Sequence, residues 1–358
     1  MIVRAARTAE GLRIGPTPSS AAHSALLETA GALLIWDVAD PDVPAASVWD
    51  PALAIDVAWQ VYGPEAVPAL LGQTDAFEPS PAPALDHARR AALVAWAAAW
   101  WPASTLAGVP PLDPRILSVE RADALLAVEH LLDGEELLLA ALADGLVAGR
   151  ALRLAPGIHA AVRPALTALE GRLEEAAADR GITAGSAAAT VPARADLALA
   201  ASATVRSTAG VLAEGTRPLD LSAFAPGTVD AAGSAHWQAR SGQSDVVLEV
   251  SAPRAPSSSP TDPGPLDAVF AGIALTLRPE PGRFAGSISV PVTILLTPPD
   301  ARTLTLASPG YRGHGDVDAE ALLAIAHARL DRARETVIDD SGLPSRAVLL
   351  AEQEAARR

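Results

Sequence analysis

The alternation of apolar and polar residues between Leu266 and Ser308 is the clearest structural signal in the chain. Apolar residues occupy every second position from Ile273 to Leu277, again from Ile288 to Leu296, and finally at Leu304 and Leu306. Successive side chains on a strand point to opposite faces, so each run has one apolar face and one mostly polar face. We therefore expect an antiparallel β-meander whose apolar face is covered by another element.

The first half of the chain favours helices joined by short, proline-marked connections. Its longest apolar run extends from Ala91 to Trp101, and a segment that is apolar on every side is normally a buried helix. We expect a bundle-like arrangement without strands. The predicted helices cover approximately residues 20–35, 51–62, 84–101, 116–132, 135–147 and 156–180.

A second helical pattern follows the meander. Beyond Asp316, apolar residues recur at alternating spacings of four and three, which places them on one stripe of a helix. Such a stripe can cover a sheet or pack against a partner helix, and a final short helix is expected within residues 344–358. The stripe comprises Ala319, Leu323, Ala326, Leu330, Ala333 and Val337.

These patterns predict an α+β protein. A helical domain is expected over residues 1–182, and a weakly patterned linker over 183–194. An antiparallel β-sheet or β-sandwich with a covering C-terminal helix is expected over 195–358. The pattern of residues 195–213 is compatible with either a helix or a strand.

Composition narrows the functional classes. The chain contains no lysine, asparagine or cysteine, which is typical of a GC-rich bacterial genome. The absence of cysteine excludes disulfides, thiol catalysis and cysteine-ligated metal centres. The net charge is −15 and no run of three arginines occurs, so neither nucleic acid nor an anionic membrane is an expected partner.

Localisation follows from hydropathy. The N-terminus lacks the apolar core of a signal peptide. The longest apolar run is about half of the roughly 20 residues that a membrane span requires. These features predict a cytoplasmic protein.

The best metal-binding candidate is the glycine-rich segment with His314, Asp316 and Asp318. It offers an imidazole and two carboxylates within five residues, donors that suit a divalent ion. The competing interpretation is structural, because Asp316 can cap the following helix and Asp318 can stabilise its first turn.

Motifs for catalysis or cofactor binding are not found. The sequence holds no GxSxG, HExxH or phosphate-binding loop, so no cofactor is expected. Six of the seven tryptophans lie between Trp36 and Trp101. Trp96 and Trp100 are one helical turn apart and Trp101 is adjacent, so they can form core, an interface anchor, or a platform that stacks on a ligand.

Three functional hypotheses remain. The first is a non-enzymatic interaction protein, such as a scaffold, adaptor or regulatory subunit of a bacterial multi-protein system. Another protein would then contact Trp96, Trp100 and Trp101 together with Leu323 and Leu330. The second is a metal-assisted hydrolase built on the His314 segment, and the third is a small-ligand or carbohydrate sensor that uses the N-terminal tryptophans.

Overall fold

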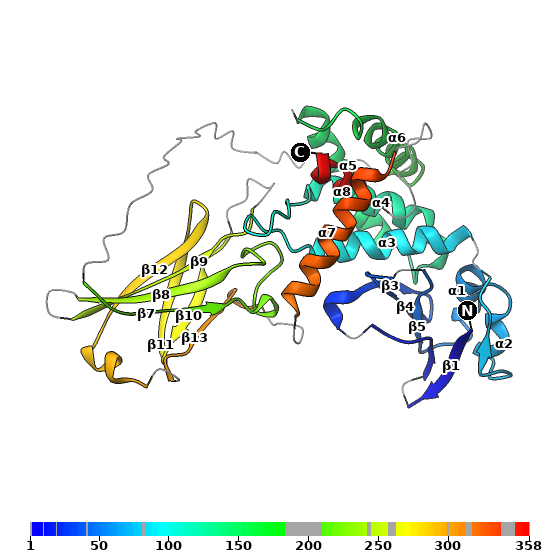
Figure 1. Ribbon diagram of the computed structural model, residues 1–358. Helices are drawn as coiled ribbons and strands as arrows, with labels where there is room; N and C mark the ends of the chain where they lie inside the picture. The colour runs from blue at the N-terminus through cyan, green and yellow to red at the C-terminus, as the bar shows by residue number, and fades with distance from the viewer. Residues whose placement is uncertain are drawn as a thin grey trace.

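The computed structural model describes residues 2–9, 11–18, 20–40, 42–80, 83–155, 157–182, 210–241, 245–256, 263–298, 301–311, 317–337 and 348–357. Within these residues the chain is α+β, which confirms the predicted class, and it contains two antiparallel sheets (Figure 1). One hydrophobic cluster joins the N-terminal sheet to the helices, and a second lies inside the C-terminal sheet. We call these parts the helical unit and the β unit.

The helical unit begins with a six-stranded antiparallel sheet, so the expectation of an all-helical first half is wrong. Its strand order is β3-β4-β5-β2-β1-β6, and the short 3₁₀ helix Ala21–His23 precedes β3. The strands are β1 (Val3–Thr8), β2 (Gly11–Ile14), β3 (Ser24–Thr29), β4 (Ala32–Asp37), β5 (Ala45–Val48) and β6 (Ala76–Phe77).

The hairpin of β3 and β4 replaces the helix predicted over residues 20–35. Every second residue of each strand is buried, including Leu27 on β3 and Trp36 on β4, as the period of a strand requires. Gly31 makes the turn with a φ of +72°, and a Cβ at that position would lie 2.4 Å from the backbone oxygen of Asp50. Only glycine fits this turn, because it tolerates positive φ and has no Cβ.

Helices cover the sheet and then extend the unit away from it (Figure 1). Helix α3 lies against β3, and the indole Nε1 of Trp96 donates a hydrogen bond of 2.7 Å to the Ala22 carbonyl. The predicted helices beyond residue 50 correspond to observed ones, except that the fifth continues to Leu154 and the sixth begins only at Arg163, and the short helix at Ala66–Leu70 was not predicted. The helices are α1 (Ala54–Tyr62), α2 (Ala66–Leu70), α3 (Pro83–Trp100), α4 (Pro114–Ala127), α5 (Glu136–Leu154) and α6 (Arg163–Asp179), with the 3₁₀ turn Glu129–Leu131 after α4.

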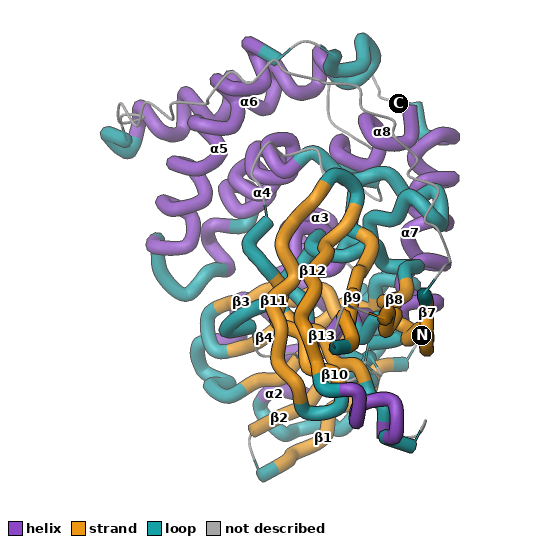
Figure 2. The backbone as a smooth tube through the Cα atoms, turned by 90° about the vertical axis from the view of Figure 1, so that its left-hand side faces the viewer, coloured by secondary structure: helices purple, strands orange, loops and turns teal. Residues whose placement is uncertain are grey.

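The C-terminal helices α7 (Ala319–Glu335) and α8 (Leu350–Arg357) also belong to the helical unit. Leu322, Ala326 and Leu330 of α7 enter the same buried cluster as α3 and α4, and α7 lies beside α8 in both Figure 1 and Figure 2. The expectation that the C-terminal helix covers the β-sheet is therefore wrong, because its apolar stripe packs on other helices.

Helix α8 is held by buried charges. Glu120 of α4 is fully buried, and its carboxylate accepts hydrogen bonds from the backbone N–H groups of Leu350 (2.8 Å) and Ala351 (3.0 Å). The same carboxylate pairs with Arg90 of α3 at 2.7 Å. One side chain thus joins α3, α4 and the start of α8, where the backbone N–H groups have no partner inside the helix.

The β unit is a seven-stranded antiparallel sheet with the order β13-β10-β11-β12-β9-β8-β7. The meander prediction holds for its core, but the strand expected to reach Leu296 ends at Val290 and a 3₁₀ turn, Val292–Leu296, follows. A further 3₁₀ turn, Leu221–Ala223, follows β7. The strands are β7 (Val211–Pro218), β8 (Ser234–Ser241), β9 (Val246–Pro253), β10 (Leu266–Phe270), β11 (Ile273–Glu280), β12 (Arg283–Val290) and β13 (Leu304–Ala307).

This sheet folds over itself at β12. Strand β12 pairs with β11 only from Arg283 to Ala285, and then continues along β9 alone as far as Val290. Gly286 lies at the divergence, where a Cβ would approach the Thr276 carbonyl oxygen to 2.6 Å. The fold brings the rings of Trp237 on β8 and Phe270 on β10 to a centroid distance of 4.6 Å, so the sheet covers its own apolar face.

A buried carboxylate joins the two units. Asp230 of the β unit is 1% exposed and accepts a hydrogen bond of 2.6 Å from the Ser104 hydroxyl. It also accepts one of 2.8 Å from the Thr105 backbone N–H, and one of 3.1 Å from its own loop at Ala232. These contacts fix the loop after α3 against the loop before β8.

The predicted domain division is thus altered at its C-terminal end, because α7 and α8 pack with the helical unit. The proposed linker, residues 183–194, and the ambiguous segment 195–209 lie outside the described residues, and Val211 begins a strand. Among the described helices, none is long and apolar enough to cross a membrane.

Candidate functional site

The outward face of β7, β8, β9 and β12 carries two rows of side chains that the strand register places side by side. Glu214, Gln238, Glu249 and Ser287 are successive partners across the four strands. The second row consists of Thr216, His236, Ser251, Ala285 and Arg278, the last of which lies on β11. We call these residues, together with Arg240, Glu280 and Arg283, the polar face.

The polar face is wide and open. The hollow above it has a volume of about 1170 Å³. Neighbouring strands lie about 4.8 Å apart, so the row from Thr216 to Arg278 spans about 19 Å. The opposite face of the same strands is buried against β10, so the alternation of each strand directs its polar residues outward.

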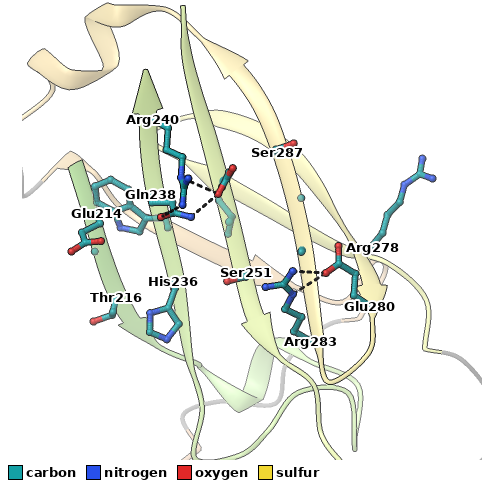
Figure 3. A pocket seen from close by; sticks show the side chains of 16 residues that line it. Glu214, Thr216, His236, Gln238, Arg240, Ser251, Arg278, Glu280, Arg283 and Ser287 are labelled. Atoms are coloured by element: carbon teal, nitrogen blue, oxygen red, sulfur yellow. Dashed lines mark hydrogen bonds and ion pairs between the residues drawn. The ribbon is translucent and has the colours of Figure 1, made fainter. Parts of the chain in front are cut away.

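Ionic and hydrogen-bonded pairs organise the middle of the polar face (Figure 3). The Gln238 amide donates a hydrogen bond of 2.5 Å to Glu249, its direct cross-strand partner, and the Arg240 guanidinium lies 3.5 Å from the same carboxylate. At the β11–β12 turn, the Arg283 guanidinium donates to Glu280 at 2.8 Å. These pairs hold their side chains in defined positions.

Two opposite charges at the ends of the polar face are uncommitted. Within the described part of the chain, neither Glu214 on β7 nor Arg278 on β11 makes a hydrogen bond or an ion pair. Both side chains are exposed, and Figure 3 shows them at opposite sides of the hollow. Chemically, this arrangement can bind a polar molecule that presents a positive group at one end and a negative group at the other.

Sequence reasoning identified parts of these strands but not the site. On β8, Ala235, Trp237 and Ala239 alternate with His236 and Gln238, and this alternation contains the signal that half of the side chains face solvent. The missing information was the register, which decides that Gln238 meets Glu249 and that β7 lies beside β8. Register depends on contacts between distant segments.

The tryptophans proposed as an interface are mostly core residues. Trp96 is 2% exposed and Trp101 is 8% exposed, and their rings contact each other edge to face with centroids 6.3 Å apart. Trp100 is partly buried against the same cluster. A partner cannot reach Trp96 in this fold, so assigning it to an interface is wrong, whereas Trp101 exposes only a small edge. The exposed tryptophans are instead Trp49 and Trp59.

The two leucines proposed on the C-terminal stripe differ in burial. Leu330 is fully buried in the helical unit, so its assignment to a partner interface is also wrong. Leu323 is partly exposed and packs at the margin of the same cluster. Ala326, Leu330 and Ala333 of the predicted stripe are buried in α7, and Leu322 and Arg329 are buried beside them.

The candidate metal segment is described only at its end. His314 and Asp316 lie outside the described residues. Asp318 caps α7, because its carboxylate accepts a hydrogen bond of 3.0 Å from the Ala321 backbone N–H. No group of three or more histidine, aspartate or glutamate side chains that could hold a metal ion occurs in the described ranges. The metal site remains a prediction.

That prediction has a direct test. If His314, Asp316 and Asp318 hold a divalent ion, zinc, manganese or calcium will raise the melting temperature of the wild-type protein, because a ligand of the folded state stabilises it. His314→Ala will abolish the rise, whereas His327→Ala, at an exposed position on α7, will leave it unchanged. A melting temperature that is insensitive to all three ions ends the hypothesis.

Comparisons with known proteins identify no relative of this chain. No protein-family model, curated protein or solved structure matches the chain.

Proposed function

We propose that this chain is a non-enzymatic interaction protein, an adaptor or regulatory subunit of a bacterial multi-protein system, whose polar face binds an extended segment of a partner protein. The observation that carries this proposal is the pair of uncommitted charges, Glu214 and Arg278, at the two ends of an ordered, open polar surface. Fold alone would not supply this inference, which depends on the site.

The dimensions of the polar face suit a polypeptide. An extended chain advances about 3.3 Å per residue, so about six residues would follow the row from Thr216 to Arg278. Between the ends, the segment would meet Gln238, Ser251 and Ser287, whose amide and hydroxyl groups both donate and accept hydrogen bonds. A surface of this polarity resembles the rim of protein interfaces more than an apolar small-ligand pocket.

Charge decides the orientation of the segment. A basic side chain of the partner would lie near Glu214, and an acidic side chain near Arg278. Complementary charges contribute more to specificity and association rate than to affinity, so the proposal predicts binding that weakens as salt concentration rises.

Charge reversal tests the proposal. The tagged full-length chain is captured from its native host, and co-purifying proteins are quantified by mass spectrometry. We expect a stoichiometric partner with the wild type, and an approximately tenfold loss of that partner with Arg278→Glu or Glu214→Arg, because a like charge then faces each partner residue.

Two matched controls carry the same charge changes away from the polar face. Arg332→Glu and Glu335→Arg alter exposed residues near the end of α7, and both should retain the partner at the wild-type level. A partner retained equally by all four variants would place the interface elsewhere, and the recovery of no partner at all would count against the adaptor function.

A further inference from the structure

An apolar groove lies where the helical unit meets the β unit. Helices α3 and α4 form one wall, with Val94, Ala98 and Leu117 among the lining residues. Pro226 and Pro256 of the β unit form the other wall, and Trp101 also lines the groove. Its volume is about 320 Å³, at the lower end of the range for small-molecule sites, which often occur between domains.

One charged side chain lines this groove. Arg121 of α4 is exposed, and it makes no hydrogen bond or ion pair within the described part of the chain. Two other lining side chains carry a polar group, and both groups already donate a hydrogen bond. The Ser118 hydroxyl donates to the Pro114 carbonyl at 3.0 Å, and the Trp101 indole N–H donates to the Pro110 carbonyl at 2.9 Å. The groove therefore combines an apolar interior with one available guanidinium.

We propose that this groove binds a small amphipathic anion, a molecule with an apolar body and a single carboxylate that pairs with Arg121. The apolar body would displace water from Trp101 and Leu117, and the carboxylate would accept charge-assisted hydrogen bonds from the guanidinium. An uncharged apolar molecule would leave Arg121 unused, and a cation would be repelled by it.

Ligand binding would also connect the two units. Residues of the helical unit and of the β unit line the groove, so an occupant would contact α3 and α4 on one side and the 226–227 loop on the other. A ligand that prefers this arrangement stabilises it by mass action. The site is separate from the polar face, because none of its lining residues belongs to that surface.

The experiment compares decanoate with decanol on the full-length protein by isothermal titration calorimetry. We expect saturable binding of decanoate at one site per chain. Arg121→Gln should weaken decanoate binding about fivefold and change decanol binding less than twofold, because a partly exposed ion pair has an energy of about 1 kcal/mol. The control Arg332→Gln, which removes an exposed arginine of α7, should change neither.

A second variant fills the groove. Ala98 is exposed and lines the groove, so Ala98→Trp adds bulk there without replacing a buried side chain. We expect it to abolish decanoate binding while circular dichroism and melting temperature stay at wild-type values. The proposal is overturned if decanoate shows no saturable binding, if Arg121→Gln affects both probes equally, or if Ala98→Trp binds normally. It is also overturned if Ala98→Trp converts a dimer into a monomer, because a second copy would then be the occupant.

Discussion

Replacing Glu120 with alanine is expected to lower the free energy of unfolding by about 3–5 kcal/mol, the typical result of removing one partner from a buried ion pair. The substitution leaves the Arg90 guanidinium, which is 10% exposed, without its carboxylate. It also removes the acceptor for the Leu350 and Ala351 backbone N–H groups at the start of α8. Helix α8 should then separate from α4.

The raised pKa of Glu120 indicates that a neutral side chain of the same size should destabilise the protein less than alanine does. Burial raises the pKa of this carboxyl group, and outweighs the opposing effects of Arg90 and of the two α8 backbone groups. The site therefore tolerates a neutral side chain better than an empty space, and Glu120→Gln should lose about half as much stability as Glu120→Ala.

Urea unfolding and amide hydrogen exchange measure both effects. Glu120→Ala should show fast exchange at Leu350 and Ala351, whose N–H groups should be protected in the wild type by their hydrogen bonds to Glu120. The control Glu175→Ala removes the same side chain from an exposed position on α6 and should change stability by less than about 0.5 kcal/mol. Equal stability of the two alanine variants would show that Glu120 does not hold α8.

Asp230→Ala should cost about 3 kcal/mol and separate the unfolding of the two units. The substitution leaves the Ser104 hydroxyl and the Thr105 backbone N–H without their acceptor at the junction, and each buried donor that loses its partner costs about 1–3 kcal/mol. The wild type should unfold in one calorimetric transition. The variant should show two, because the units retain separate hydrophobic cores.

A double-mutant cycle measures the interaction energy between Ser104 and Asp230 at this junction. Ser104→Ala and Asp230→Ala should be strongly non-additive, because both remove the same 2.6 Å hydrogen bond. Asp267→Ala removes an exposed aspartate from β10 and should leave the single transition intact. Additive losses, or a single transition in Asp230→Ala, would show that the units are coupled by other contacts.

Local patterns predicted the later elements well. The alternation after Leu266 and the helical spacing between Pro114 and Asp179 gave elements of the correct type, because each pattern had enough residues to define its period. The β3–β4 hairpin was missed because its Ala- and Leu-rich sequence also favours a helix, and the burial of Leu27 and Trp36 is imposed by tertiary contacts.

The candidate site depended on information that no single segment contains. The polar face exists because five strands from different parts of the chain align their outward residues. The tryptophan cluster illustrates the opposite problem. Trp96 and Trp101 were visible in the sequence, but only the packing of α3 shows that most of their surface is buried.

Because α8 docks on Glu120, helix α4 cannot complete its packing until the end of the chain has been synthesised. The acceptor on α4 and the backbone donor of Leu350 are 230 residues apart in the chain. A ribosome that adds about 5–20 residues per second needs roughly 10–50 s to cover that interval. During this time α4 has left the ribosome, but α8 does not yet cover the Glu120 carboxylate and the apolar surface around it. A chaperone that recognises exposed apolar helices would find its substrate in this nascent chain rather than in the finished protein.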